Sequence, residues 1–154
     1  MKHPYDEVYL NDVIEEQGRF FEGLQDEPSP IDSSDLLTAY MHSSTRRQLD
    51  EGQAWYLTLD AERIKSVFLQ ESGYEPKAGE PLRGFLPKWI GEFYAAAQWY
   101  WNVPSAELCD KLPVATLCVV YPGAHDLDLM TAVEKLGRPG LGGKQAVTRH
   151  LLSH

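Results

Sequence analysis

Apolar residues recur at intervals of three and four along most of the chain, which is the spacing of one buried face on an α-helix. The first such stretch predicts an amphipathic helix over residues 5–25, with acidic residues at the intervening positions. A Gln-Asp-Glu-Pro-Ser-Pro run then ends this helix. The next stripe predicts a helix from about Ser33 to Gly52, which begins at Asp32 as the N-cap and ends at Gly52 in the left-handed conformation.

The remainder of the chain also favours helices, because no apolar run alternates strictly and has a second run to pair with as a strand. The sequence AWYLTL, residues 54–59, is interpreted as a packed connector, and residues 72–83 are interpreted as a loop. The further expected helices cover about 60–71, about 87–101, a short segment from Ser105, a segment from Pro113 to Tyr121, and Asp126 to Leu136. The pattern predicts an all-α fold: a compact bundle of about six helices around the central helix 87–101.

Length and composition indicate one domain. With 154 residues and 43% apolar content, the chain can bury one full core. We expect a single helical domain over residues 1–137. Residues 138–154 contain the sequence RPGLGGKQ and predict a flexible basic tail.

The expected central helix raises the question of where its aromatic residues point. Residues 93–102 hold five aromatic rings, three consecutive alanines and no charge. On a helical wheel most of the rings fall on one broad side, which predicts the centre of the core. Trp99 instead falls on the polar side, whose other members are Lys88, Gly91, Glu92, Ala95 and Asn102. Either another part of this chain covers Trp99, or Trp99 faces a protein partner together with Lys88, Glu92 and Asn102.

The net charge of −9 is concentrated at the N-terminal end of the chain. Residues 1–35 carry ten acidic side chains against two basic ones, whereas the remainder is nearly balanced. This distribution repels phosphate backbones and argues against nucleic-acid binding. The acidic residues Asp12, Glu15 and Glu16 are interpreted in two ways: as the solvated face of the first helix, or as a surface complementary to a basic protein partner.

The chain carries no sign of secretion or membrane insertion. Its first seven residues include Asp6 and Glu7 and begin no apolar stretch of the kind found in signal peptides, and no later run approaches the roughly 20 apolar residues that span a bilayer. Cys109 and Cys118 lack Cys-x-x-Cys spacing, which predicts two ordinary buried thiols rather than a disulfide or a zinc site. We expect a cytoplasmic protein.

Residues 125–128, His-Asp-Leu-Asp, are the only compact group of candidate acid–base or metal-ligating side chains. The pair His125 and Asp126 is similar to the His-Asp doublet of metal-dependent phosphohydrolases. That family also needs an earlier histidine and a later aspartate, but here only His42 precedes the pair within a helix and no aspartate follows Asp128. We therefore interpret Asp126 as a helix cap, and expect no metal, cofactor or catalytic residue. A small metal-binding protein or hydrolase centred on His125, Asp126 and Asp128 is kept as the alternative.

Two further classes find little support. Ser43, Ser44 and Thr45 adjoin His42, but consecutive residues on a helix point in different directions, so they form no catalytic constellation. A helix-turn-helix regulator would use the helices on either side of Gly52. The connector there is longer than the usual 3–4 residues, so a helix-turn-helix regulator ranks below the interaction module and the metal-binding protein or hydrolase.

Part of the sequence resembles a known group of proteins. In this chain Gln98, Trp99 and Tyr100, then Leu112 and Pro113, then Tyr121, Pro122 and His125 match a Tyr-Gln-Trp-Tyr-like element, a Leu-Pro start and a Tyr-Pro-x-x-His element. These elements are similar to those of uncharacterised small all-helical bacterial proteins that are common in gut anaerobes. Residues 50–64 also match, whereas Ala97 stands where a bulkier aromatic residue is frequent. The genes of that group often lie beside genes for other small proteins, some of which resemble ADP-ribosyltransferase-type toxins.

The resemblance implies a toxin-neutralising or accessory partner protein and supplies no catalytic residue. Together with the charge distribution and Trp99, it predicts a non-enzymatic protein–protein interaction module, antitoxin-like in function. The expected partner is a protein with a basic or toxin-like surface.

Overall fold

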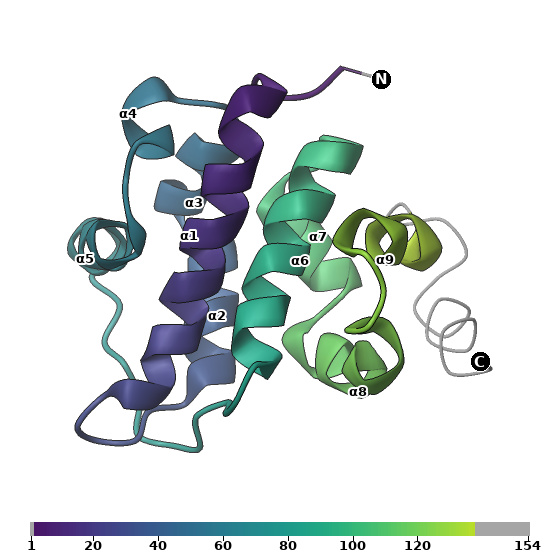
Figure 1. Ribbon diagram of the computed structural model, residues 1–154. Coiled ribbons are helices and arrows are strands. Elements are labelled where there is room, and N and C mark those ends of the chain that lie inside the picture. Colours follow the sequence, from purple (N-terminus) through teal and green to yellow (C-terminus); the bar gives the residue numbers. More distant parts are fainter. Residues whose placement is uncertain (1, 138–154) are drawn as a thin grey trace.

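The computed structural model describes residues 2–137, so the predicted tail over 138–154 lies outside the described residues. Within residues 2–137 the chain forms nine α-helices and two 3₁₀-helices (Figure 1). The only β-type pairing in this range is an isolated bridge between Ile31 and Ala78. The predicted all-α bundle is therefore confirmed.

The helices follow one another with short connections, apart from the segment between α5 and α6. The first stretch contains η1 Glu7–Tyr9, α1 Leu10–Gly23 and η2 Leu24–Asp26. The second contains α2 Ser33–Met41, α3 Ser44–Asp50, α4 Ala54–Leu57 and α5 Ala61–Ser72. The third contains α6 Leu86–Trp101, α7 Ser105–Lys111, α8 Val114–Ala124 and α9 Leu129–Leu136.

Several boundaries differ from the prediction, and α8, for example, runs to Ala124 instead of ending at Tyr121. The helix expected over 33–52 is two helices, because the Ser43 side chain accepts a hydrogen bond from the Arg46 amide at 3.1 Å and starts α3 as an N-cap. The connector AWYL is a helical turn, α4. The last helix is capped by Asp128 rather than Asp126, since the Asp128 carboxylate accepts from the Thr131 amide at 3.4 Å.

Helix α6 occupies the centre of the bundle, as predicted. In Figure 1, α1 runs antiparallel beside it, α8 and α9 lie on the opposite side, and α2 and α7 lie behind. The prediction that Gly91, Ala95 and Trp99 lie on a polar side of α6 is wrong, because all three are buried. That side is covered because α1 packs directly on it.

Two glycines allow α1 and α6 to approach this closely. A Cβ atom on Gly91 would lie 2.7 Å from the Gln17 carbonyl oxygen and 3.0 Å from the Gly18 Cα. The Gln17 side-chain amide also donates to the Gly91 carbonyl oxygen at 2.8 Å. The crossing thus combines close backbone contact with a buried hydrogen bond.

The substitution Gly91→Ala should lower the free energy of unfolding by about 1–3 kcal/mol, because the added methyl group meets backbone atoms that cannot rotate away. Urea unfolding of both proteins measures the difference. Gly23→Ala is the matched control, since its Cβ would meet no atom within 4 Å. The control should be neutral or stabilising by up to about 1 kcal/mol, because alanine is the better helix former. Equal effects of the two substitutions would contradict the close α1–α6 contact.

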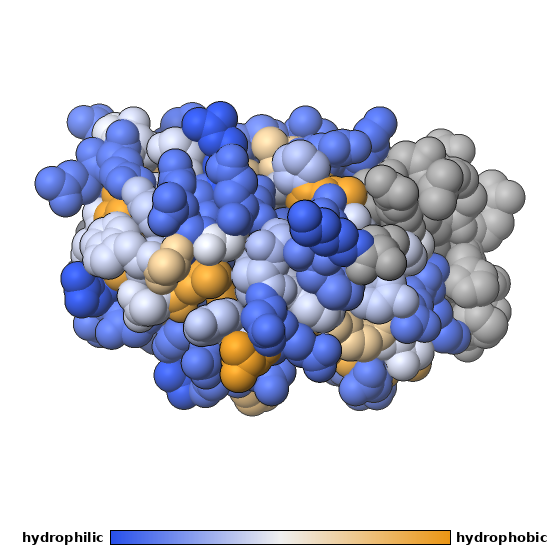
Figure 2. Space-filling view, turned by 90° about the horizontal axis from the view of Figure 1, so that it is seen from above, coloured by the Kyte–Doolittle hydropathy of each residue, from blue (hydrophilic) through white to orange (hydrophobic). Residues whose placement is uncertain are grey.

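The surface is mostly polar at the end of the bundle seen in Figure 2, where apolar side chains form separate spots between hydrophilic ones. The large apolar side chains exposed among residues 2–137 are Val8, Tyr9, Trp55, Phe85 and Val119. None of the helices in this range has the length and apolar content needed to cross a bilayer.

Candidate functional site

The N-terminal segment covers Trp99, which is only 5% exposed. The Trp99 indole N–H donates to the Tyr5 carbonyl oxygen at 2.8 Å. The His3 ring stacks on the indole with centroids 3.6 Å apart, and its Nδ1 lies 3.0 Å from the Trp99 carbonyl oxygen. Trp99 is therefore buried by another part of the same chain and does not lie on an open surface. The cover comes from residues 3–5.

The other residues predicted to accompany Trp99 do not gather around it. Lys88 and Glu92 line a surface pocket of about 270 Å³ with aromatic residues of α6 and α8. Burial raises the pKa of the Glu92 carboxyl, and Lys88 opposes this rise. Asn102 ends α6 in the left-handed conformation, with φ of 49°, and lines a different pocket.

By contrast, the three predicted acidic residues Asp12, Glu15 and Glu16 do share one surface. They line a cleft of about 290 Å³ with Arg19 of α1 and residues 57–60, which lead into α5. Asp60, the N-cap of α5, adds a fourth carboxylate. Among the described residues Arg19 is the one cation that lines the cleft, so these residues give the cleft a net negative charge.

Two of the cleft carboxylates form ion pairs with Arg19. Its guanidinium contacts Glu15 Oε1 at 2.5 Å and Glu16 Oε1 at 3.1 Å. The second oxygen of Glu16 is buried and has no hydrogen-bond donor among residues 2–137. This oxygen is therefore an acceptor that the described residues leave unsatisfied.

His125 and Asp126 lie next to each other at the C-terminal end of α8. His125 Nε2 lies 3.3 Å from Asp126 Oδ1, and the His125 ring stacks on Tyr121 with centroids 4.4 Å apart. Asp128 is occupied as the N-cap of α9. No cluster of three or more His, Cys, Asp or Glu side chains with metal-binding geometry occurs within the described residues.

A buried polar network that the sequence interpretation missed joins α3 to α7. Arg46 is fully buried, and its Nη1 lies 3.3 Å from Asp50 Oδ1. The Asp50 carboxylate also accepts from the Ser105 amide at 2.7 Å and from the Ser105 hydroxyl at 2.5 Å. Burial raises the pKa of the Asp50 carboxyl, and the Arg46 charge with the Ser105 donors opposes the rise.

Tyrosine hydroxyls surround the same network. Burial raises the pKa of Tyr5 to about 12, while the Arg46 charge lowers it, and Tyr40 is shifted in the same direction for the same reasons. Neither hydroxyl has a hydrogen-bond partner within residues 2–137. These hydroxyls and the guanidinium form a buried polar centre beneath the end of α3.

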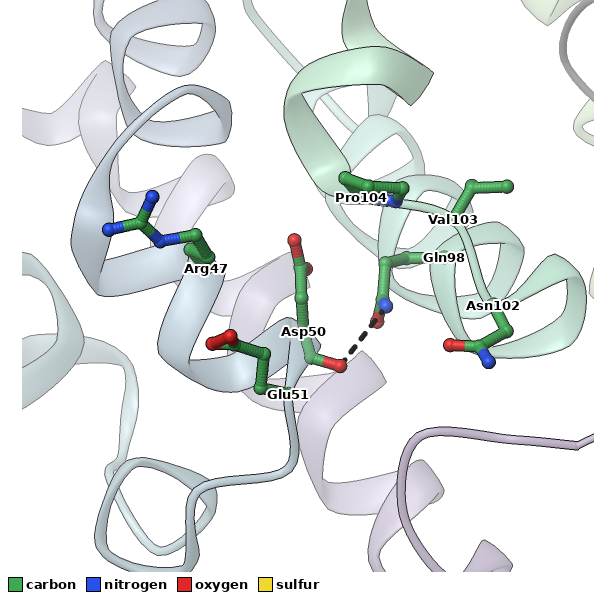
Figure 3. A pocket seen from close by; sticks show the side chains of 7 residues that line it. All are labelled: Arg47, Asp50, Glu51, Gln98, Asn102, Val103 and Pro104. Atoms are coloured by element: carbon green, nitrogen blue, oxygen red, sulfur yellow. Dashed lines mark hydrogen bonds between the residues drawn. The ribbon is translucent and has the colours of Figure 1, made fainter.

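A pocket of about 230 Å³ opens beside this centre (Figure 3). The C-terminal end of α3 contributes Arg47, Asp50 and Glu51 to one wall. The opposite wall contains Gln98, Asn102, Val103 and Pro104, from the end of α6 and its connection to α7. Gln98 is 1% exposed; its Nε2 lies 3.5 Å from the Asp50 carbonyl oxygen, and its Oε1 has no donor among the residues described.

Only a weak sequence signal marks these residues. Arg46 and Asp50 are four residues apart, which places them on the same helix face, but the same spacing is common in exposed ion pairs. Ser105 and Gln98 are 55 and 48 residues from Asp50, so no local pattern links them.

Comparisons with known proteins add no relative: no family model, curated protein or solved structure matches the chain. The resemblance to the gut-anaerobe group therefore stays a prediction. The candidate sites are defined by the geometry of this chain.

Proposed function

We propose that this protein is a non-enzymatic protein–protein interaction module that binds a basic segment of its partner in the acidic cleft of α1. The observation that carries the proposal is the convergence of Asp12, Glu15, Glu16 and Asp60 on one cleft. Arg19 neutralises only part of this charge. The resemblance noted in the sequence makes a toxin-like protein the expected partner, with this chain as its antitoxin-like or accessory component.

The contacts of Glu16 support a cationic side chain as the group that binds. The Glu16 side chain is 18% exposed, so its carboxylate is held within the cleft rather than free in solvent. Its Oε2 is an acceptor without a donor in the described residues. A lysine or arginine side chain that enters the cleft would donate a hydrogen bond to the Glu16 carboxylate. This carboxylate is partly desolvated, and a charge-assisted hydrogen bond is strong in such a position. Charge complementarity of this kind also accelerates association.

The proposal is tested by recovering the partner from the native host with the tagged protein and measuring its binding. Reversing two exposed cleft charges together, Asp12→Lys with Glu15→Lys, should weaken binding at least 10-fold and slow association. Raising the salt concentration should weaken the unaltered complex in the same sense, because exposed charges are screened. Glu75→Lys is the matched control, since this exposed glutamate lies in the segment between α5 and α6, outside the cleft.

Failure to recover a stoichiometric partner would count against an interaction module. A partner whose binding is reduced equally by the cleft reversal and by Glu75→Lys would indicate only a general charge effect. A partner unaffected by both would place the interface elsewhere on the molecule.

A further inference from the structure

The pocket between α3 and α6 has the composition of a built polar site. Its walls are fixed from behind, because the Asp50 carboxylate is held by Ser105 and Arg46 within the core. The amide of Gln98 is almost fully buried, yet its Oε1 has no hydrogen-bond partner among residues 2–137. An unpaired buried amide oxygen is unfavourable by about 1–3 kcal/mol, so a donor at this position would be stabilising.

Several features of the inner wall favour a positive donor. Helices α3 and α6 both end at the pocket, at Asp50 and Trp101, and the carbonyl groups at a helix C-terminus carry partial negative charge. Within the described part of the chain, the Asp50 carbonyl oxygen accepts only a long 3.5 Å bond from Gln98. At the outer edge of this wall, the exposed Glu51 adds a carboxylate. A small ammonium group would meet acceptors on both walls.

A positive charge, that of Arg47, lies at the rim of the pocket. Arg47 lines the pocket from the α3 side and is exposed. Its guanidinium points outward in Figure 3, and its long side chain can rotate to a group at the mouth without displacing packed residues. A guanidinium in this position suits a carboxylate. At about 230 Å³ the pocket is smaller than the roughly 300–1,000 Å³ of sites for drug-sized ligands, so it fits a ligand of few atoms.

We propose that this pocket binds a small zwitterion of the α-amino-acid class. Its ammonium group faces Gln98 Oε1 and the Asp50 carbonyl oxygen, and its carboxylate faces Arg47. Val103 and Pro104 form the apolar part of the wall, against which a small side chain packs. This site shares no residue with the acidic cleft, so it stands independently of the proposed protein partner.

The test is titration of the full chain with L-alanine, L-serine and L-glutamine, followed by NMR shifts of the Gln98 side-chain amide and of residues 102–105. At least one amino acid should show saturable binding. Its methyl ester, which lacks the carboxylate charge, and its N-acetyl derivative, which lacks the ammonium charge, should each bind at least 10-fold more weakly. No saturable shift with any of the three amino acids would overturn the proposal.

Substitutions at the rim identify the groups that read the two charges. Arg47→Gln and Glu51→Gln should each weaken binding at least 10-fold, and both residues are exposed, so the fold should be unaffected. Arg63→Gln, on the exposed surface of α5, is the control and should leave binding unchanged. Binding of the ester as tight as that of the free amino acid would show a plain amine site and overturn the zwitterion. Indifference to Arg47→Gln would have the same meaning.

Discussion

Replacing Asp50 with alanine should lower the free energy of unfolding by about 3–5 kcal/mol, because it leaves the fully buried Arg46 guanidinium without its counter-charge. The same change removes the acceptor of the Ser105 amide and hydroxyl, so α3 and α7 lose their direct polar connection. Urea unfolding followed by circular dichroism measures the loss. It is a large fraction of the 5–15 kcal/mol by which domains are usually stable.

Two further variants separate the buried charge from other effects of the substitution. Glu51→Ala removes the neighbouring exposed carboxylate and should change stability by less than about 0.5 kcal/mol. The double substitution Arg46→Met with Asp50→Ala removes both buried charges, and should therefore be more stable than Asp50→Ala alone. If the double substitution were the less stable of the two, the penalty would come from lost packing rather than from an unpaired charge.

The local chemistry of the sequence was sufficient to predict most helix starts and ends. Asp32 caps α2 by accepting from the Asp35 amide at 3.1 Å, and Gly52 has the expected left-handed conformation, with φ of 72°. The Ser43 cap was missed because the apolar stripe continues through it, and periodicity alone gives no sign of a break. The prediction was correct where a cap coincided with a change of pattern.

The faces of α6 were beyond the reach of the hydropathy pattern. A helical wheel assumes that polar and small residues face solvent, whereas Gly91 and Ala95 are small because another helix contacts them closely. Seen from the sequence, a glycine that permits close packing is identical to a glycine on an exposed face. For this reason Trp99 seemed isolated among polar positions, although α1 and the N-terminal segment enclose it.

The buried network illustrates the same limit for the candidate sites. The common face of Asp12, Glu15 and Glu16 could be predicted because these residues lie on one helix within five positions, whereas the cleft itself also needs residues 57–60. Asp50, Gln98 and Ser105 meet only through the packing of α3, α6 and α7. A surface that one helix builds can therefore be predicted from the sequence, whereas a pocket shared by three elements cannot.

Replacing Trp99 with alanine should lower the free energy of unfolding by about 3–5 kcal/mol, because the indole fills the smaller core between α1 and α6 with Tyr5, Leu10 and Val13. It should also release the N-terminal segment, which loses the His3 stack and the donor to the Tyr5 carbonyl oxygen. Hydrogen exchange at residues 3–9 should accelerate more than at the centre of α6. Trp55→Ala is the matched control, since that indole is 49% exposed and its loss should be small.

Residues 3–5 would also have to move before a protein partner could contact Trp99. A partner that anchors on this indole must first displace residues 3–5, so removing residues 2–5 should strengthen that binding. Binding that is unchanged by this deletion and by Trp99→Ala would leave the acidic cleft as the interface and Trp99 as part of the core. A Trp99→Ala protein as stable as Trp55→Ala would instead mean that the N-terminal segment does not hold Trp99 in solution, because burial of the indole and its contribution to stability go together.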